Sequence, residues 1–124
     1  MLQMRDPSEF EEVIKETNLH QYADKKVNCL SQGLCRKVSI ALTLIGNPKI
    51  VILDEPTSNL DVKSQKDIWL LIKKLADKNK QRTIIIASQH LEEAEALASR
   101  VCILKQGQII VDDTPSNIKS KLGA

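Results

Sequence analysis

Residues 50–61 have the sequence IVILDEPTSNLD, in which a short apolar run is followed by two adjacent carboxylates and a polar turn. The run at 50–53 is rich in β-branched residues and is bounded by prolines, which is typical of a strand buried on both faces of a parallel sheet. Asp54 and Glu55 then stand at the carboxyl end of this strand. Ligands of open α/β sheets bind at that end of the strands, so this stretch predicts an α/β fold with a site beside the two carboxylates.

Two amphipathic helices are predicted before the strand. The first covers 8–17, where Ser8 and Glu11 have the spacing of a capping box. The second begins at Ser31, a good N-cap residue, and ends before the Gly-Asn-Pro sequence at 46–48. Its predicted buried face carries apolar residues at helical spacing: Leu34, Val38, Leu42 and Ile45.

The elements predicted after the strand repeat the same alternation. A helix extends from Asp61 to about Lys78, with Asp61 or Ser58 as its cap, and a second buried strand at 83–87 leads into a helix at 91–98. The helix that starts at Asp61 carries four apolar residues on one face: Ile68, Leu71, Ile72 and Leu75. A hairpin at 101–111 and a short helix capped by Thr114 complete the chain. Two successive strand–helix units favour a mainly parallel sheet flanked by helices.

The adjacent carboxylates can take separate roles, because successive side chains of a strand point in different directions. In nucleotide hydrolysis, an aspartate can hold Mg²⁺ while a neighbouring carboxylate deprotonates the attacking water. A purely structural acidic turn is the alternative, and these two residues alone favour it. About twenty residues earlier, the helix start at Ser31 and Gly33 offers unpaired N–H groups to a phosphate, although such starts are usually only caps.

Four motifs in one order remove much of this ambiguity. They are LSQGL at 30–34, IVILDE at 50–55, SNLD at 58–61, and His90. Together they resemble the signature motif, Walker B strand, D-loop and switch histidine of the ATP-binding cassette (ABC) ATPases. The resemblance covers essentially the whole chain and is greatest to transporter ATPase domains of the A-type lipid exporter subfamily. It implies a partial P-loop NTPase fold, with part of the helical subdomain at 1–47 and the catalytic core part at 48–124.

The resemblance also implies residue roles, with ATP and Mg²⁺ as cofactors. Asp54 is expected to hold Mg²⁺ through its water shell, Glu55 to act as general base, and His90 to contact the terminal phosphate. The remaining expected nucleotide contacts are Ser31, Gln32, Gly33 and Asp61. Those of the signature motif are expected to bind the nucleotide held by an opposing domain.

This sequence departs from the family pattern in three respects. Gln32 stands where the signature usually has glycine, and Leu34 where it usually has glutamine, so both an active and a degenerate composite site stay open. No GxxxxGK[ST] phosphate-binding loop occurs among the 124 residues. We therefore expect the chain to be the C-terminal half of an ATPase domain, to need an N-terminal half with the Walker A motif, and to be inactive alone.

The function expected from the resemblance is that of a transporter's ATPase, which couples ATP binding and hydrolysis to transmembrane transport. Its expected partners are a second ATPase domain, arranged head to tail, and transmembrane domains that hold it on the cytoplasmic side of the membrane. The alternatives are a soluble ABC ATPase of the DNA-repair or chromosome-maintenance type, and a non-catalytic module that lends its signature motif to a partner's ATP. The net charge of +2 gives no reason to expect nucleic acid as a partner. No apolar run approaches the roughly 18 residues that cross a bilayer.

Overall fold

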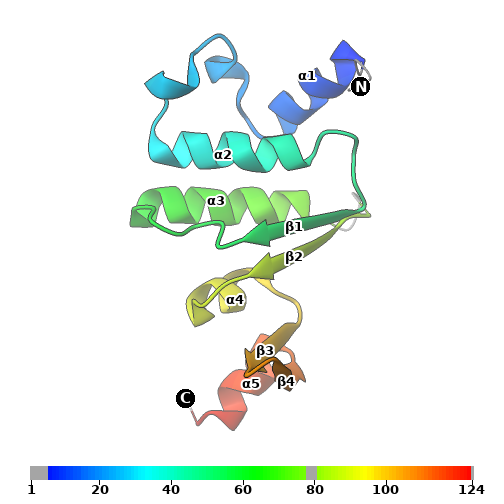
Figure 1. Cartoon of the computed structure of the whole chain (residues 1–124), viewed down its shortest axis with the longest axis vertical. Helices are drawn as coiled ribbons and strands as arrows, with labels where there is room; N and C mark the ends of the chain where they lie inside the picture. Colours follow the sequence, from blue (N-terminus) through cyan, green and yellow to red (C-terminus); the bar gives the residue numbers. More distant parts are fainter. Residues whose placement is uncertain (1–5, 78–80, 124) are drawn as a thin grey trace. The chain divides into compact units, whose positions relative to one another are not determined.

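The computed structural model describes residues 6–77 and 81–123, and the chain divides into two units at Ala87 and Ser88 (Figure 1). The first unit contains α1 (Pro7–Glu16), two short 3-10 helices, η1 (His20–Tyr22) and η2 (Val27–Cys29), then α2 (Gln32–Thr43), β1 (Ile50–Asp54), α3 (Val62–Leu75) and β2 (Thr83–Ala87). The second unit contains α4 (Leu91–Leu97), β3 (Val101–Lys105), β4 (Gln108–Asp113) and α5 (Pro115–Lys121). The division expected from the sequence, 1–47 and 48–124, stays a prediction.

The first unit confirms the predicted α/β architecture. Strands β1 and β2 pair in parallel, with Ile50 opposite Thr83 and Asp54 opposite Ala87, so that both carboxyl ends lie at the same edge. Figure 1 shows α3 between α2 and the two strands. The predicted apolar face of α3 is buried as expected, through Ile68, Leu71, Ile72 and Leu75. Helix α3 ends at Leu75, and the expected end near Lys78 falls outside the described residues.

Two details of the predicted helices are wrong. Asp6, not Ser8, caps α1, because its carboxylate accepts a hydrogen bond from the Ser8 amide at 3.1 Å and Pro7 takes the first helical position. On α2 the predicted face is not the buried one, since Leu42 is 63% exposed. The buried residues at the end of this helix are Ile40, Ala41 and Leu44. Apolar residues occur on more than one side of α2, so periodicity alone did not identify the side that packs on α3.

The expectation of strands buried on both faces is also wrong for the described residues. Burial alternates along β1, where Val51 and Leu53 are buried while Ile50 and Ile52 are 60% and 69% exposed. On β2, Ile85 pairs with Ile52 and is 51% exposed. One face of the two-stranded sheet is thus covered, and the other presents isoleucine side chains. Parallel sheets normally have both faces covered.

A buried ion pair ties α1 to the rest of the first unit. Arg82, immediately before β2, has a side chain only 3% exposed and contacts the Glu16 carboxylate at 3.1 Å. The same guanidinium donates hydrogen bonds to the Leu75 carbonyl at 3.4 Å and to the Asn47 side-chain oxygen at 3.2 Å. Arg82 therefore joins the ends of α1 and α3 to the loop between α2 and β1.

Replacing Arg82 should destabilise the protein strongly. We expect Arg82→Leu to lower the free energy of unfolding by about 3–5 kcal/mol, because it removes the buried guanidinium that contacts the largely buried Glu16 carboxylate. Urea unfolding followed by circular dichroism measures this change. Lys74→Ala is the control: Lys74 is exposed and donates to the Glu16 carbonyl at 2.9 Å, so its loss should cost about 1 kcal/mol or less. Equal shifts in the two variants would contradict the importance of the pair.

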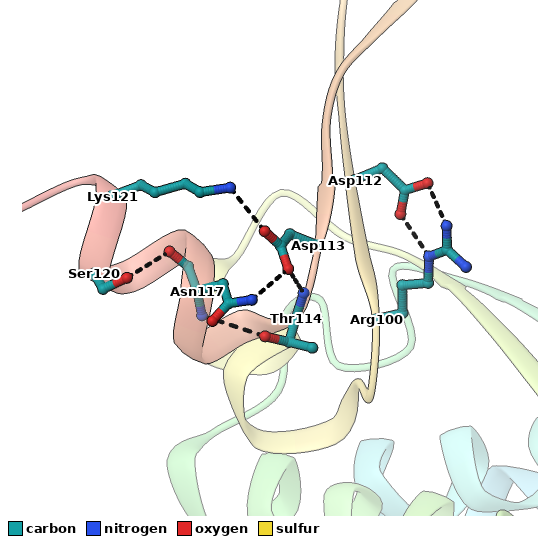
Figure 2. A network of polar contacts seen from close by, with 7 residues as sticks. All are labelled: Arg100, Asp112, Asp113, Thr114, Asn117, Ser120 and Lys121. Carbon is teal, nitrogen blue, oxygen red and sulfur yellow. Dashed lines mark hydrogen bonds and ion pairs between the residues drawn. The ribbon is translucent and has the colours of Figure 1, made fainter.

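The second unit confirms the predicted hairpin and final helix. Strands β3 and β4 are antiparallel, and Gln106 and Gly107 between them have φ of 50° and 77°, as tight hairpin turns require. Arg100 donates hydrogen bonds to both carboxylate oxygens of Asp112, from Nε at 2.6 Å and from Nη2 at 2.7 Å. Figure 2 shows this pair. It also shows Asp113, at the end of β4, accepting hydrogen bonds from three groups of the adjoining segment: the Thr114 amide, the Asn117 side chain and the Lys121 ammonium.

These contacts predict an unusually acidic carboxyl group. The Lys121 ammonium, the Asn117 side chain and the Thr114 amide lower the pKa of Asp113 from 3.8 to about 2. Because folding favours the charged form, its stabilising contribution is complete above about pH 4 and is lost as the pH falls towards 2. Carbon NMR of the Asp113 carboxyl should give a midpoint near 2, which Lys121→Met should raise. Lys105→Met, which removes an exposed cation of the hairpin, should leave it unchanged. A wild-type midpoint near the ordinary value would contradict the network.

Candidate functional site

The two carboxylates predicted to carry chemistry lie where β1 ends. Asp54 is the last residue of the strand and is exposed, whereas Glu55 is half-buried and begins a turn. The backbone of Glu55 has φ of 46°, in the left-handed region that non-glycine residues rarely adopt at a cost of roughly 1–2 kcal/mol. Its amide still donates to the Ala87 carbonyl at 2.9 Å, which extends the pairing of β1 with β2 by one residue.

The carbonyl side of Glu55 is held by two donors. The Ser58 amide donates to the Glu55 carbonyl at 3.1 Å and closes the turn. The Arg36 guanidinium, from α2, reaches the same carbonyl with Nη1 at 3.5 Å and the Ser58 carbonyl with Nη2 at 3.3 Å. A planar guanidinium can span two acceptors in this way. The backbone of Glu55 is therefore fixed from β2 on one side and from α2 on the other.

The predicted anion-binding helix start is present at α2. Ser31 is exposed and caps the helix, with its hydroxyl oxygen accepting from the Leu34 amide at 3.2 Å. A hydroxyl also has a proton to donate, so this cap does not prevent Ser31 from binding an anion. Gln32 is the first helical residue and is exposed, so its side chain adds bulk where the family pattern has glycine. The start of α2 therefore offers backbone N–H groups together with one hydroxyl.

Gly33 has a packing role that the sequence did not reveal. A Cβ at this position would lie 2.7 Å from the Oγ and 2.9 Å from the Cβ of Ser64, on α3. Real Cβ atoms do not approach so closely, and rotation of the Ser64 hydroxyl would not relieve the contact, because the Cβ of Ser64 is fixed by the α3 backbone. Glycine is thus needed here for the close approach of the two helix starts.

Asp61 is the N-cap residue of α3. Its carboxylate accepts from the Ser64 amide at 3.2 Å, and hydrogen bonds from the Ser64 hydroxyl and amide lower the pKa of this carboxyl. Ser64 thereby links the D-loop residue Asp61 to Gly33 of the signature sequence. A nucleotide contact by Asp61 stays a prediction, as do those of the other candidate residues.

His90 belongs to the second unit, where it precedes α4. Its imidazole makes no capping hydrogen bond to the helix, and its amide donates to the Ser88 hydroxyl at 3.1 Å. The side chain is exposed. This residue is therefore held by its backbone, at a helix start, with its ring accessible.

The suitability of the site for Mg²⁺ depends on Asp54. Among the described residues, no three or more histidine, cysteine, aspartate or glutamate side chains gather in a way that would enclose a metal ion. Mg²⁺ usually keeps several waters and needs only one or two protein carboxylates when a nucleotide supplies phosphate oxygens. The exposed carboxylate of Asp54 fits that kind of site.

Comparison with known proteins identifies the family. A family model described as "ABC transporter" matches residues 3–58. The human retinal-specific phospholipid-transporting ATPase ABCA4 is 38% identical over 115 residues, which are 93% of this chain. The mouse glucosylceramide transporter ABCA12 is 40% identical over 93% of this chain, and the human cholesterol transporter ABCA5 is 38% identical over 94%. The chain belongs to the ABC transporter ATPase family.

Solved ABC structures confirm the fold. The cbiO1 protein of Clostridium perfringens, part of the ABC transporter complex cbiONQ, has a TM-score of 0.87 and 29% identity. It matches 98% of this chain, which spans 50% of that protein. MJ1267, an ATP-binding cassette of an ABC transporter, supports the fold with a TM-score of 0.83.

The chain spans 4–7% of the curated ABCA relatives named above. It is thus a part of an ABC nucleotide-binding domain with a partial P-loop NTPase fold, and the DNA-repair alternative is not favoured.

Two residues of this ABC segment were missed from the sequence. Arg36 and Ser64 connect the signature helix to the Walker B and D-loop segments, yet neither belongs to a motif used to recognise the family. Arg36, three residues after Gly33, lies on the same side of α2, but its acceptors are backbone carbonyls, which no sequence pattern marks.

The Gly33–Ser64 contact can be tested by a double-mutant cycle. Gly33→Ala should lower the free energy of unfolding by about 1–3 kcal/mol, because the added methyl group overpacks the helix contact. The same substitution should cost much less in a Ser64→Gly background, where the clashing atoms are absent. Urea unfolding of the four proteins measures the coupling, and Ser39→Ala on an exposed part of α2 is the control. Additive effects would contradict the steric account.

Proposed function

We propose that this chain supplies the catalytic carboxylates and the signature surface of an ABC transporter's ATPase domain, which couples ATP hydrolysis to transmembrane transport. The observation that carries the proposal is the end of β1, where the exposed Asp54 adjoins Glu55 in a backbone conformation held from both sides. Together with membership of the family, this arrangement favours chemistry over a purely structural acidic turn.

In the proposed reaction, Glu55 accepts a proton from the water that attacks the terminal phosphate of ATP. Asp54 would hold Mg²⁺ through the ion's water shell, and the bound ion would neutralise charge that develops on the phosphate oxygens. His90 contacts the terminal phosphate through its accessible ring. Asp61 lies at the start of α3 and contacts the nucleotide from the D-loop.

The signature residues serve a second nucleotide in this proposal. Ser31, Gln32 and Gly33 contact ATP held by a second ATPase domain, which binds head to tail. The donors are the backbone N–H groups at the start of α2 and the Ser31 hydroxyl. Gln32 and Leu34 depart from the family pattern, so this signature has one glycine fewer than usual, and its side-chain amide stands at position 32 instead of 34.

The uncovered face of the β1–β2 sheet supports a further partner. Ile50, Ile52 and Ile85 present exposed apolar side chains on that face, and exposed apolar patches of this kind mark interaction sites. We infer that the remainder of the ATPase domain, which carries the Walker A motif, packs there. Without it we expect no ATP turnover from the isolated chain, since the phosphate-binding loop is absent from these residues.

Membrane attachment is proposed to come from transmembrane domains, with this chain on the cytoplasmic side. None of the helices in the described residues has the length and apolar character needed to cross a bilayer. Three of the relatives are named for transport of phospholipid, glucosylceramide and cholesterol. We therefore propose a lipid as the transported substrate of the full-length protein.

The role of Glu55 can be tested in the full-length protein. Glu55→Gln should lower the ATP turnover number at least about 100-fold while ATP affinity is retained, because an amide cannot accept the proton of the attacking water. Glu12→Gln, on an exposed part of α1, is the control and should hydrolyse ATP as the wild type does. Phosphate release and binding of a fluorescent ATP analogue measure the two properties. Wild-type turnover in Glu55→Gln would show that another group is the base.

A further inference from the structure

Arg36 is a cation outside the recognised motifs that contacts the backbone of the proposed general base. Its guanidinium lies against two carbonyl oxygens, those of Glu55 and Ser58, at 3.5 and 3.3 Å. The side chain is half-buried, and both contacts join α2 to a turn about twenty residues further along the chain. Both hydrogen bonds are long, and the positive charge of the guanidinium adds electrostatic attraction to the two carbonyl dipoles.

The turn that Arg36 contacts needs external support. Glu55 has a left-handed backbone, which in a residue other than glycine is stable only where the surroundings enforce it. Asn59 in the same turn also has a positive φ, 61°, which asparagine adopts more readily than glutamate does. On its amino side, Glu55 is fixed by the hydrogen bond to Ala87. On its carbonyl side, the contacts are the Ser58 amide within the turn and Arg36 from outside it.

Arg36 also lies on the side of α2 that meets α3. Gly33 stands one helical turn before it and packs against Ser64 too closely for any Cβ. The contact at Gly33 therefore sets the position of α2 on α3, and the two hydrogen bonds of Arg36 join α2 to the turn after β1. The start of this helix is Ser31, which the proposed function assigns to the nucleotide of the opposing domain.

We propose that Arg36 is a positioning residue for the ATPase reaction: it holds the Glu55–Ser58 turn and couples the signature helix to the general base. This inference rests on the proposed function, because it assumes that Glu55 is the base. Arg36 itself does not contact the reacting atoms in this role. It sets the direction of the Glu55 side chain through the backbone carbonyl.

The experiment uses the full-length protein and separates turnover from binding. Arg36→Met keeps the aliphatic stem and removes both hydrogen bonds, so we expect kcat to fall about 10- to 100-fold with KM for ATP and ATP affinity within about twofold of wild type. Arg36→Lys keeps the charge but cannot span both carbonyls, and its kcat should lie between the two. Lys73→Met removes a cation from an exposed part of α3, about 16 Å along the helix from its start, and is the matched control.

A double variant tests whether Arg36 acts through Glu55. Arg36→Met should have little further effect on the residual rate of Glu55→Gln, since the group that it positions is already inactive. An equal fold loss in both backgrounds, or wild-type kcat in Arg36→Met, would overturn the inference. If Arg36→Met fails to fold, Arg36→Lys decides: reduced kcat at unchanged ATP affinity supports the inference, and wild-type kcat overturns it.

Failure of the proposed function has a different result. In that case Glu55→Gln itself would hydrolyse ATP at the wild-type rate, and the role of Arg36 would fall with it. Loss of turnover in Glu55→Gln together with wild-type turnover in Arg36→Met would overturn the inference about Arg36 alone.

Discussion

The close packing of α2 on α3 is the constraint on which the positions of the candidate residues in the first unit depend. Gly33 permits it, because any side chain there would overlap Ser64. With the two helix starts in contact, Arg36 reaches the carbonyls of the turn after β1. The helix that Ser31 caps is therefore joined through Arg36 to the turn that begins at Glu55, although in the proposed function these two residues serve different nucleotides. A glycine usually explained by phosphate approach has, in this chain, an additional role in helix packing.

The opposite ends of the same helices are held by different chemistry. Arg82 forms a largely buried ion pair with Glu16 and hydrogen bonds with Leu75 and Asn47. Burying these charges is costly, and the several acceptors around one guanidinium offset that cost. A steric fit and a backbone contact thus position the functional end of α2, whereas electrostatics fixes α1 to the segment beyond α2.

Much of the fold could be predicted because local chemistry specifies it. The strand at 83–87, the caps at Ser31 and Asp61, the hairpin turn and the helix after Thr114 each depend on a few neighbouring residues, and the structure confirms them. What could not be predicted depends on distant neighbours. Periodicity did not identify which side of α2 meets α3, and the apolar composition of β1 gave no indication that one face would stay uncovered. The contacts of Arg36 could not be predicted for the same reason, since its acceptors are backbone atoms that leave no pattern in the sequence.

In the proposed function, the first unit of this chain carries both a general base for its own nucleotide and a binding surface for the nucleotide of a second domain. The most direct measurement is the dimerisation of complete ATPase domains in the presence of a non-hydrolysable ATP analogue, monitored by light scattering. The variant to compare with the wild type is Ser31→Arg, and Ser39→Arg is the control. Ser39 lies eight residues further along the sequence, about 12 Å along α2. We predict that Ser31→Arg binds the analogue but stays monomeric, while Ser39→Arg dimerises like the wild type. Normal dimerisation of Ser31→Arg would contradict the proposed function.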